Sequence, residues 1–179
     1  MRAIALCLGT LVLALASQPR RATAQVEYKP SGARAIDAGV EAPQIELATL
    51  DGGRVKLSAL RGHPVVITFW GTWCPPCRDE FPALVAAHRK HRDAGLEILA
   101  VNQRDQELST KDVEIFAKEF GVDFTVALDP RGRSRRSYRL VALPTTVFID
   151  SAGTIRTVRS GPISARQLAD GIATILPGK

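Results

Sequence analysis

No apolar run at the N-terminus of this sequence is long enough to make a confident membrane span. A helix needs about 20 apolar residues to cross a bilayer, whereas the run at residues 3–16 has fourteen. Internal repeats and low-complexity tracts are also absent. These absences favour a single globular domain of ordinary complexity.

Acidic residues are outnumbered, with 18 against 24 basic residues. Three of the basic residues, Arg2, Arg20 and Arg21, lie in residues 1–24, which contain no acid. The remaining chain therefore has 21 basic and 18 acidic residues and a net charge of +3. So small a surplus is not the signature of a nucleic-acid-binding protein, and no nucleic-acid partner is expected.

Residues 1–24 are predicted to be an export signal, because Arg2 precedes the apolar run and residues 22–24 (ATA) offer a small-residue cleavage site. A retained membrane anchor is the alternative. Cys7 would be discarded with the signal, and the two remaining cysteines are an even number that suits an oxidising compartment. We therefore expect an exported, periplasmic or extracytoplasmic protein. A flexible lead, residues 25–39, would precede one domain, residues 40–179.

Both remaining cysteines lie in the stretch 70–77 (WGTWCPPC), which follows an apolar run typical of a buried strand. Pro75 and Pro76 fit the first turn of a helix, so the thiols would lie where a strand passes into a helix N-terminus. Unpaired N–H groups and the helix dipole there favour a thiolate on Cys74. The i, i+3 spacing puts the two side chains about 5–6 Å apart at Cβ, within reach of a disulfide. This predicts a redox-active pair in which Cys74 attacks a partner and Cys77 resolves the mixed disulfide.

Two structural alternatives compete with this interpretation. A disulfide across four residues would contribute only about 2 kcal/mol, against about 3 for a fifteen-residue loop, and would join nothing distant. A zinc site would need two further ligands. His88, the nearer histidine of the His88/His91 pair, lies about 16 Å along the same predicted helix from Cys77 at 1.5 Å per residue.

The remaining sequence alternates strand and helix patterns, which argues for a three-layer α/β domain. A strand–helix–strand half is followed by a strand–strand–helix half. Pro82 lies inside the helix that follows the cysteines and should kink it. The patterns predict strands at 44–50, 55–57, 65–70, 96–101, 124–128, 146–150 and 154–158, and helices at 58–61, 75–91, 110–120, 134–139 and from 164 onward.

Several short motifs together resemble the thioredoxin superfamily, and within it the TlpA/ResA-like exported thiol-disulfide oxidoreductases. They are Ala42-Pro43, 51–53 (DGG), 70–77 (WGTWCPPC), 78–82 (RDEFP), 143–146 (LPTT), 148–150 (FID) and Gly153. The resemblance covers nearly all of residues 40–179. It implies a thioredoxin fold, with helices on both faces of a mixed central sheet. The strand patterns on either side of the turn at 51–53 predict an N-terminal β-hairpin addition.

The resemblance also implies roles for residues outside the cysteine pair. Pro144 would be cis and packed against the dithiol, with the backbone at Leu143 pairing with an incoming peptide. Pro75 and Pro76 would complete the surface that contacts substrate. The resemblance does not separate the roles of the two tryptophans; the residues themselves favour Trp70 in the core and Trp73 as an aromatic surface for substrate.

Glu80, one helical turn after Cys77, could exchange protons with the thiols and oppose thiolate formation by its charge. ResA-like relatives carry a glutamate with a redox role at this position, although a solvated helix acid is the alternative. In thioredoxins an aspartate at the position of Thr68 is the buried proton acceptor, so its absence leaves Glu80 as the better candidate.

A dense basic stretch precedes Leu143 and is either a solvated helix face or a rim that steers an acidic partner. Its members are Arg131, Arg133, Arg135, Arg136 and Arg139.

The expected protein is a monomeric enzyme that exchanges a dithiol with disulfides in exported client proteins. Reduction is the expected direction, supported by a membrane thiol electron donor, and the resemblance suggests apocytochrome c as one client. No metal and no cofactor beyond the Cys74–Cys77 disulfide are expected.

Other functions remain open at this point. They are a thiol oxidase or isomerase, a peroxidase, a copper-delivery protein and a redox-inert binding module. A peroxidase would carry Thr-x-x-Cys, and Gly71 stands where that threonine would be. A copper-delivery protein would have a wider cysteine spacing and a histidine late in the fold, and the three histidines are His63, His88 and His91.

Overall fold

The computed structural model describes residues 36–177. The predicted export signal, most of the predicted lead and residues 178–179 lie outside that range. Within it, no helix is both long enough and apolar enough to cross a bilayer.

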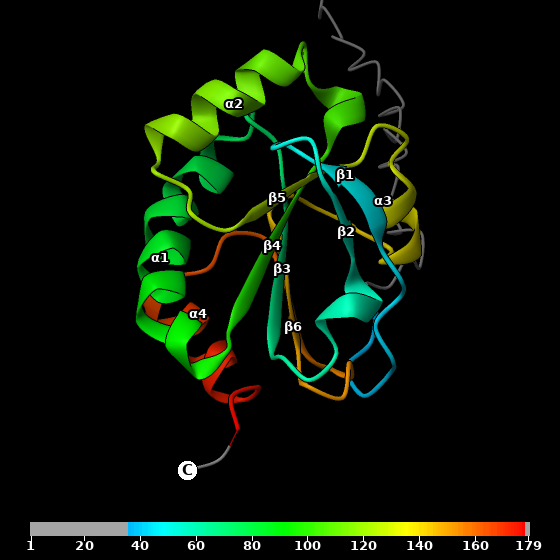
Figure 1. Cartoon of the computed structure of the whole chain (residues 1–179), viewed down its shortest axis with the longest axis vertical. Coiled ribbons are helices and arrows are strands. Elements are labelled where there is room, and N and C mark those ends of the chain that lie inside the picture. Colours follow the sequence, from blue (N-terminus) through cyan, green and yellow to red (C-terminus); the bar gives the residue numbers. More distant parts are fainter. Residues whose placement is uncertain (1–35, 178–179) are drawn as a thin grey trace, which may run out of the picture. The chain divides into compact units, whose positions relative to one another are not determined.

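The described chain forms the alternating α/β structure that the sequence predicts (Figure 1). The strands are β1 (Glu46–Thr49), β2 (Arg54–Lys56), β3 (Val65–Trp70), β4 (Glu97–Asn102), β5 (Thr125–Leu128), β6 (Thr145–Ile149) and β7 (Ile155–Ser160). The α-helices are α1 (Pro75–His91), α2 (Thr110–Glu119), α3 (Arg133–Ser137) and α4 (Ala165–Ala173). Three short 3-10 helices are η1 (Leu57–Leu60), η2 (Arg92–Ala94) and η3 (Arg104–Gln106).

All strands join one seven-stranded mixed sheet in the order β2-β1-β5-β4-β3-β6-β7. β3 lies between β4, which is parallel to it, and β6, which is antiparallel. The parallel pair β3/β4 is connected through α1, the kind of long crossover that parallel strands need. The β1/β2 hairpin extends the sheet beyond β5, which confirms the mixed sheet and the N-terminal hairpin addition.

Every residue of β3 is buried, because both faces of the sheet are covered. Side chains alternate across a strand, so Val66 and Trp70 enter one core while Val65 and Phe69 enter the other. The first core lies under α1, α2 and α4, and the second under η1 and the end of α3 (Figure 1). The three-layer expectation is therefore confirmed.

The thinner layer, formed by η1 and α3, is held by Tyr138 at the C-terminus of α3. Its ring lies 5.0 Å from that of Phe69, and its hydroxyl donates a 2.7 Å hydrogen bond to the Pro43 carbonyl. This contact connects the segment before β1 to the loop that leads to Leu143. Burial raises the pKa of the Tyr138 hydroxyl, so it stays a hydrogen-bond donor.

Most differences from the predicted elements are shifts of one or two residues at their ends. α1 includes Pro82, as the sequence predicts, and this proline is exposed. Beyond α4, Ile175 is buried and Leu176 is partly covered.

Candidate active site at the N-terminus of helix α1

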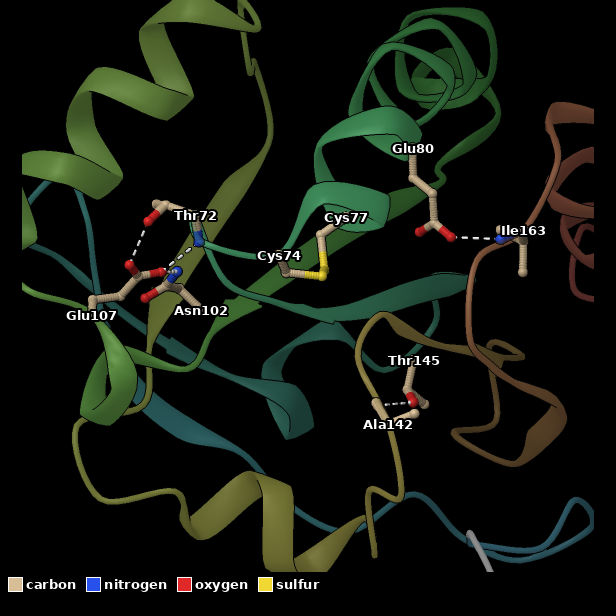
Figure 2. Close-up of a disulfide and its surroundings, with 9 residues drawn as sticks. All are labelled: Thr72, Cys74, Cys77, Glu80, Asn102, Glu107, Ala142, Thr145 and Ile163. Atoms are coloured by element: carbon tan, nitrogen blue, oxygen red, sulfur yellow. Dashed lines mark hydrogen bonds between the residues drawn. A yellow bond between two sulfur atoms is a disulfide. The ribbon is translucent and has the colours of Figure 1, made fainter.

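Cys74 and Cys77 form a disulfide at the point where β3 passes into α1 (Figure 2). Their Cα atoms are 5.3 Å apart, within the range that a disulfide requires. Cys74 is the N-cap of the helix and Cys77 lies in its first turn. Both side chains are largely buried, with 4% of Cys74 and 1% of Cys77 exposed, so Cys74 is the outer of the two.

Backbone groups at this helix end are only partly available to a sulfur atom. The Cys74 carbonyl accepts hydrogen bonds from the N–H groups of Cys77 and Arg78 at 3.1 and 3.2 Å. Pro75 and Pro76, at the first two helical positions, have no N–H to donate. The first turn therefore offers fewer donors to a Cys74 thiolate than an ordinary helix N-terminus does.

The two tryptophans take the two places that the sequence predicts for them. Trp70 is fully buried, and its ring lies 4.6 Å from that of Phe81 and 4.4 Å from that of Phe116. Trp73 is half exposed beside Cys74, and its indole lies over Gly71. A Cβ atom at Gly71 would come within 2.8 Å of that ring, so the threonine of a peroxidase motif would not fit there without moving Trp73.

The peptide bond between Leu143 and Pro144 is cis, as the family resemblance implies. Pro144 is buried at the start of β6, and its carbonyl accepts a 2.8 Å hydrogen bond from Gly161. A groove of about 390 Å³ separates this loop from the dithiol. It is lined by Trp73, Cys74, Pro75, Pro76, Gln106, Arg135, Leu140, Val141, Ala142 and Leu143. The structure thus brings the expected substrate-contacting residues together around Cys74, except that Pro144 is buried and does not itself line the groove.

Glu80 is buried, with 4% of the residue exposed, so the alternative of a solvated helix acid is wrong. One carboxylate oxygen accepts a hydrogen bond from the Ile163 N–H, across the gap between α1 and the segment before α4 (Figure 2). The other oxygen has no hydrogen-bond partner within residues 36–177. Burial raises the pKa of Glu80 to about 7, and the Ile163 hydrogen bond opposes that rise. A carboxyl group with this pKa can both give and take a proton near neutral pH.

Thr68 is buried in β3 directly opposite Thr146 of β6. Neither hydroxyl has a hydrogen-bond partner in the described part of the chain. A threonine hydroxyl does not titrate in the pH range in which a dithiol reacts. Glu80, one helical turn after Cys77 in α1, is therefore the better candidate for exchanging protons with the pair.

The basic stretch behaves mainly as a solvated face. Arg131, Arg133, Arg136 and Arg139 are exposed. Only Arg135 lines the groove beside Cys74, and its guanidinium pairs with Asp105 at 3.1 Å.

Glu107 is a buried residue near the site that the sequence reasoning missed. Its carboxylate accepts hydrogen bonds from the Thr72 N–H at 2.7 Å, from the Asn102 side chain at 2.7 Å and from the Thr72 hydroxyl (Figure 2). Thr72 lies two residues before Cys74, so Glu107 anchors the loop that carries the outer cysteine. The sequence gives only a weak indication of this role, because a single acid between η3 and α2 does not differ in pattern from any other acid in a loop. Only the spacing from Asn102, at the carboxyl end of a buried strand, points to this edge of the sheet.

A dithiol at the N-terminus of a helix that follows a central strand, facing a cis-proline loop, defines the thioredoxin-fold class of thiol-disulfide proteins. The chain belongs to the AhpC/TSA family, whose model matches residues 38–158. It is 35% identical over 149 residues to the thiol-disulfide oxidoreductase ResA of Bacillus subtilis (strain 168), covering 83% of this chain and 82% of that protein.

Solved structures agree with this assignment. A Chlorobium tepidum protein assigned as a thiol:disulfide interchange protein DsbE has a TM-score of 0.74 at 32% identity, over 80% of this chain and 100% of that one. StoA from Bacillus subtilis has a TM-score of 0.64 at 26% identity, over 73% of this chain and 96% of that one. The protein is a thiol-disulfide oxidoreductase of the ResA-like kind that acts on thiol-containing client proteins.

Burial of Glu80 should make the stability of the oxidised protein depend on pH. The folded protein holds the Glu80 proton up to pH about 7, whereas the unfolded chain releases it near the ordinary pKa of 4.5. The folded state therefore binds more protons between these values, and the free energy of unfolding should fall as pH rises through them, by up to about 3 kcal/mol.

Urea unfolding of the wild type and Glu80→Gln from pH 4.5 to 8 measures this pH dependence. The variant should lack the fall that the wild type shows, while Asp79→Asn, at an exposed neighbour, should retain it. Parallel curves for wild type and Glu80→Gln would contradict the assignment.

Loss of the Glu107 carboxylate should weaken the fold near the dithiol. Glu107→Ala leaves the Thr72 N–H and the Asn102 amide without acceptors, which should lower the free energy of unfolding by about 2–4 kcal/mol. Glu107→Gln keeps one acceptor oxygen and should cost less. Glu114→Ala, at an exposed α2 residue paired with Lys111 at 3.0 Å, is the matched control and should change stability by less than about 1 kcal/mol. Equal losses for Glu107→Ala and Glu114→Ala in denaturant titrations would show that the network does not anchor the loop.

Proposed function

We propose that this protein reduces disulfides in exported client proteins, with Cys74 as the attacking thiol and Cys77 as the resolving thiol. In the first step the Cys74 thiolate bonds to one client sulfur, and the other client sulfur leaves with the electron pair of the broken bond and takes a proton. In the second step the Cys77 thiolate attacks Cys74, which releases the remaining client sulfur. Two electrons pass to the client, and the Cys74–Cys77 disulfide forms.

The observation that carries this proposal is the unequal placement of the two sulfurs. Cys74 lines the groove that faces the Leu143–Pro144 loop, whereas Cys77 is the more deeply buried of the two and does not line that groove. A client chain in the groove would meet Cys74 first. Trp73, Pro75, Pro76 and Leu143 would contact the client there, and Pro144 would hold the loop in place.

Glu80 fits the proton transfers that the two steps require. Its raised pKa, about 7, lies near the pH at which the thiols must gain and lose protons. It lies one helical turn from Cys77, the thiol that must be deprotonated to resolve the mixed disulfide. In its ionised form it would also oppose a neighbouring thiolate.

The cellular setting follows from the sequence and the chemistry. The predicted export signal supports an extracytoplasmic location, with a retained anchor as the alternative. A reductase there needs a supply of electrons, for which a membrane thiol electron donor is the proposed source. Apocytochrome c, whose thiols must be reduced before haem attachment, is one proposed client. A monomer with no cofactor beyond the Cys74–Cys77 disulfide is sufficient for this chemistry.

A matched pair of cysteine variants tests the assignment of the two thiols. Cys77→Ser keeps the attacking thiol but cannot resolve the mixed disulfide, so it should accumulate client proteins in covalent complexes that dithiothreitol releases. Cys74→Ser should accumulate few or none. Nonreducing gels of the two variants after expression with the export signal make the comparison. Equal trapping, or stronger trapping by Cys74→Ser, would reverse the roles.

The reduction potential tests the direction. An oxidant of this type depends on a stabilised thiolate, but Pro75 and Pro76 remove first-turn donors and Glu80 adds a nearby acid. The potential should therefore be nearer the roughly −270 mV of thioredoxin than the roughly −120 mV of a strong periplasmic oxidant. Equilibration with glutathione buffers measures it. A value above about −180 mV, that of protein disulfide isomerase, would favour the oxidase or isomerase alternative.

A further inference from the structure

Large apolar side chains are exposed mainly around Trp73. Within residues 36–177 the large apolar residues that are exposed are Val40, Trp73, Leu108, Ile115 and Val141. Three of them, Trp73, Leu108 and Ile115, line a single groove of about 550 Å³ on the α2 side of the active site. We call this the α2 groove. Val141 lines the neighbouring groove on the Pro144 side, so four of the five border the dithiol face.

Each of the three large apolar side chains in the α2 groove has at least half of its surface exposed to solvent. Leu108 is 98% exposed, Ile115 is 55% exposed and Trp73 is 50% exposed. Single exposed apolar residues are ordinary on protein surfaces, but a contiguous group of them marks an interaction site. Leu108 also follows directly after Glu107, whose hydrogen bonds join this segment to Thr72. The apolar wall is therefore connected to the loop that carries Cys74.

The charged groups that line the α2 groove each have a hydrogen-bond partner, and Arg78 and Glu119 form an ion pair. Arg78 donates a 2.7 Å hydrogen bond to Glu119, and its guanidinium lies 5.1 Å from the ring centres of Phe116 and Phe120. The Asp112 carboxylate accepts from the Ser109 hydroxyl. These charged groups are therefore engaged within the protein, and the exposed side chains that the groove offers a ligand are mainly apolar.

From this arrangement we infer that the α2 groove binds a bulky apolar side chain of the client polypeptide, close in sequence to the client's reactive cysteine. The inference rests on the proposed function, in which a client sulfur must reach Cys74. Trp73 lines both the α2 groove and the groove beside Cys74. An extended client advances about 3.3 Å per residue, so residues a few positions from its cysteine pass over Trp73. One flank of the client cysteine would then lie toward Leu143 and the other toward Leu108 and Ile115.

Peptides carrying a single cysteine in mixed disulfide with glutathione provide the test. In the parent peptide every flanking residue is serine, and in two derivatives a leucine replaces the serine two positions before or two positions after the cysteine. For the wild-type chain turning over with dithiothreitol as the electron source, kcat/KM for at least one leucine peptide should exceed that for the parent by roughly tenfold, as expected when a leucine side chain leaves water. The double variant Leu108→Ser/Ile115→Ser should lose most of that preference for one leucine position. Val40→Ser, which removes an exposed apolar residue that does not line either groove, should retain it.

Each outcome has a defined meaning. A leucine preference that is the same in the double variant and the wild type would overturn the inference. A wild-type dimer in sedimentation equilibrium that the double variant converts to monomer would also overturn it, because a second copy would then cover the groove. If the wild type reduces none of the peptides, the proposed function itself fails. If it reduces all three at equal rates, only the groove assignment fails.

Discussion

The active site depends on the complete burial of β3. Because helices cover both faces of the sheet, this strand holds its carboxyl end in a fixed position, and α1 begins there within a few residues. Trp70 ends the strand inside a cluster of aromatic rings that includes Phe81 of α1 and Phe116 of α2. The same cluster therefore fixes the strand, the helix that carries Cys77 and the helix that borders the exposed apolar groove.

Two buried carboxylates near the dithiol have different environments. Glu107 accepts hydrogen bonds from the backbone and hydroxyl of Thr72 and from Asn102, so its charge has local partners and its role is to hold the loop. Within the described part of the chain Glu80 accepts only from Ile163, and burial raises its pKa. The carboxylate with several donors is suited to structure, and the one with a single donor is suited to proton exchange.

The surface around the dithiol differs in composition from one side to the other, and the two sulfurs differ in their burial. Cys74 lines a groove together with Trp73, the two prolines and the loop before Pro144, while Cys77 is more deeply buried and does not line it. Apolar residues border the opening on two sides, and the arginines of α3 are mostly exposed and turned to solvent, apart from Arg135. A protein client would therefore be recognised mainly by apolar contact and by its backbone, with charge acting at a distance.

Much of this protein follows from sequence alone, because the relevant signals are local. The apolar run at 65–70, the two prolines after Cys74 and the i, i+3 cysteines predict the buried strand, the helix start and the redox pair. Serine and glutamine three residues apart predict the capping box observed at Ser164. The cis bond at Pro144 came from the family resemblance, since no local pattern distinguishes it from an ordinary loop proline.

The tertiary structure determined the features of the site that local sequence patterns do not encode. Glu80 reads in sequence as any acid on a helix surface, and its burial arises only when the segment before α4, more than eighty residues later, packs over it. Glu107 and Thr72 are 35 residues apart, and the α2 groove draws on segments around Trp73, Leu108 and Ile115. Periodicity and capping report interactions over a few residues along the chain. Burial, hydrogen-bond partners and pKa depend on which distant segments meet, and only the folded chain determines that.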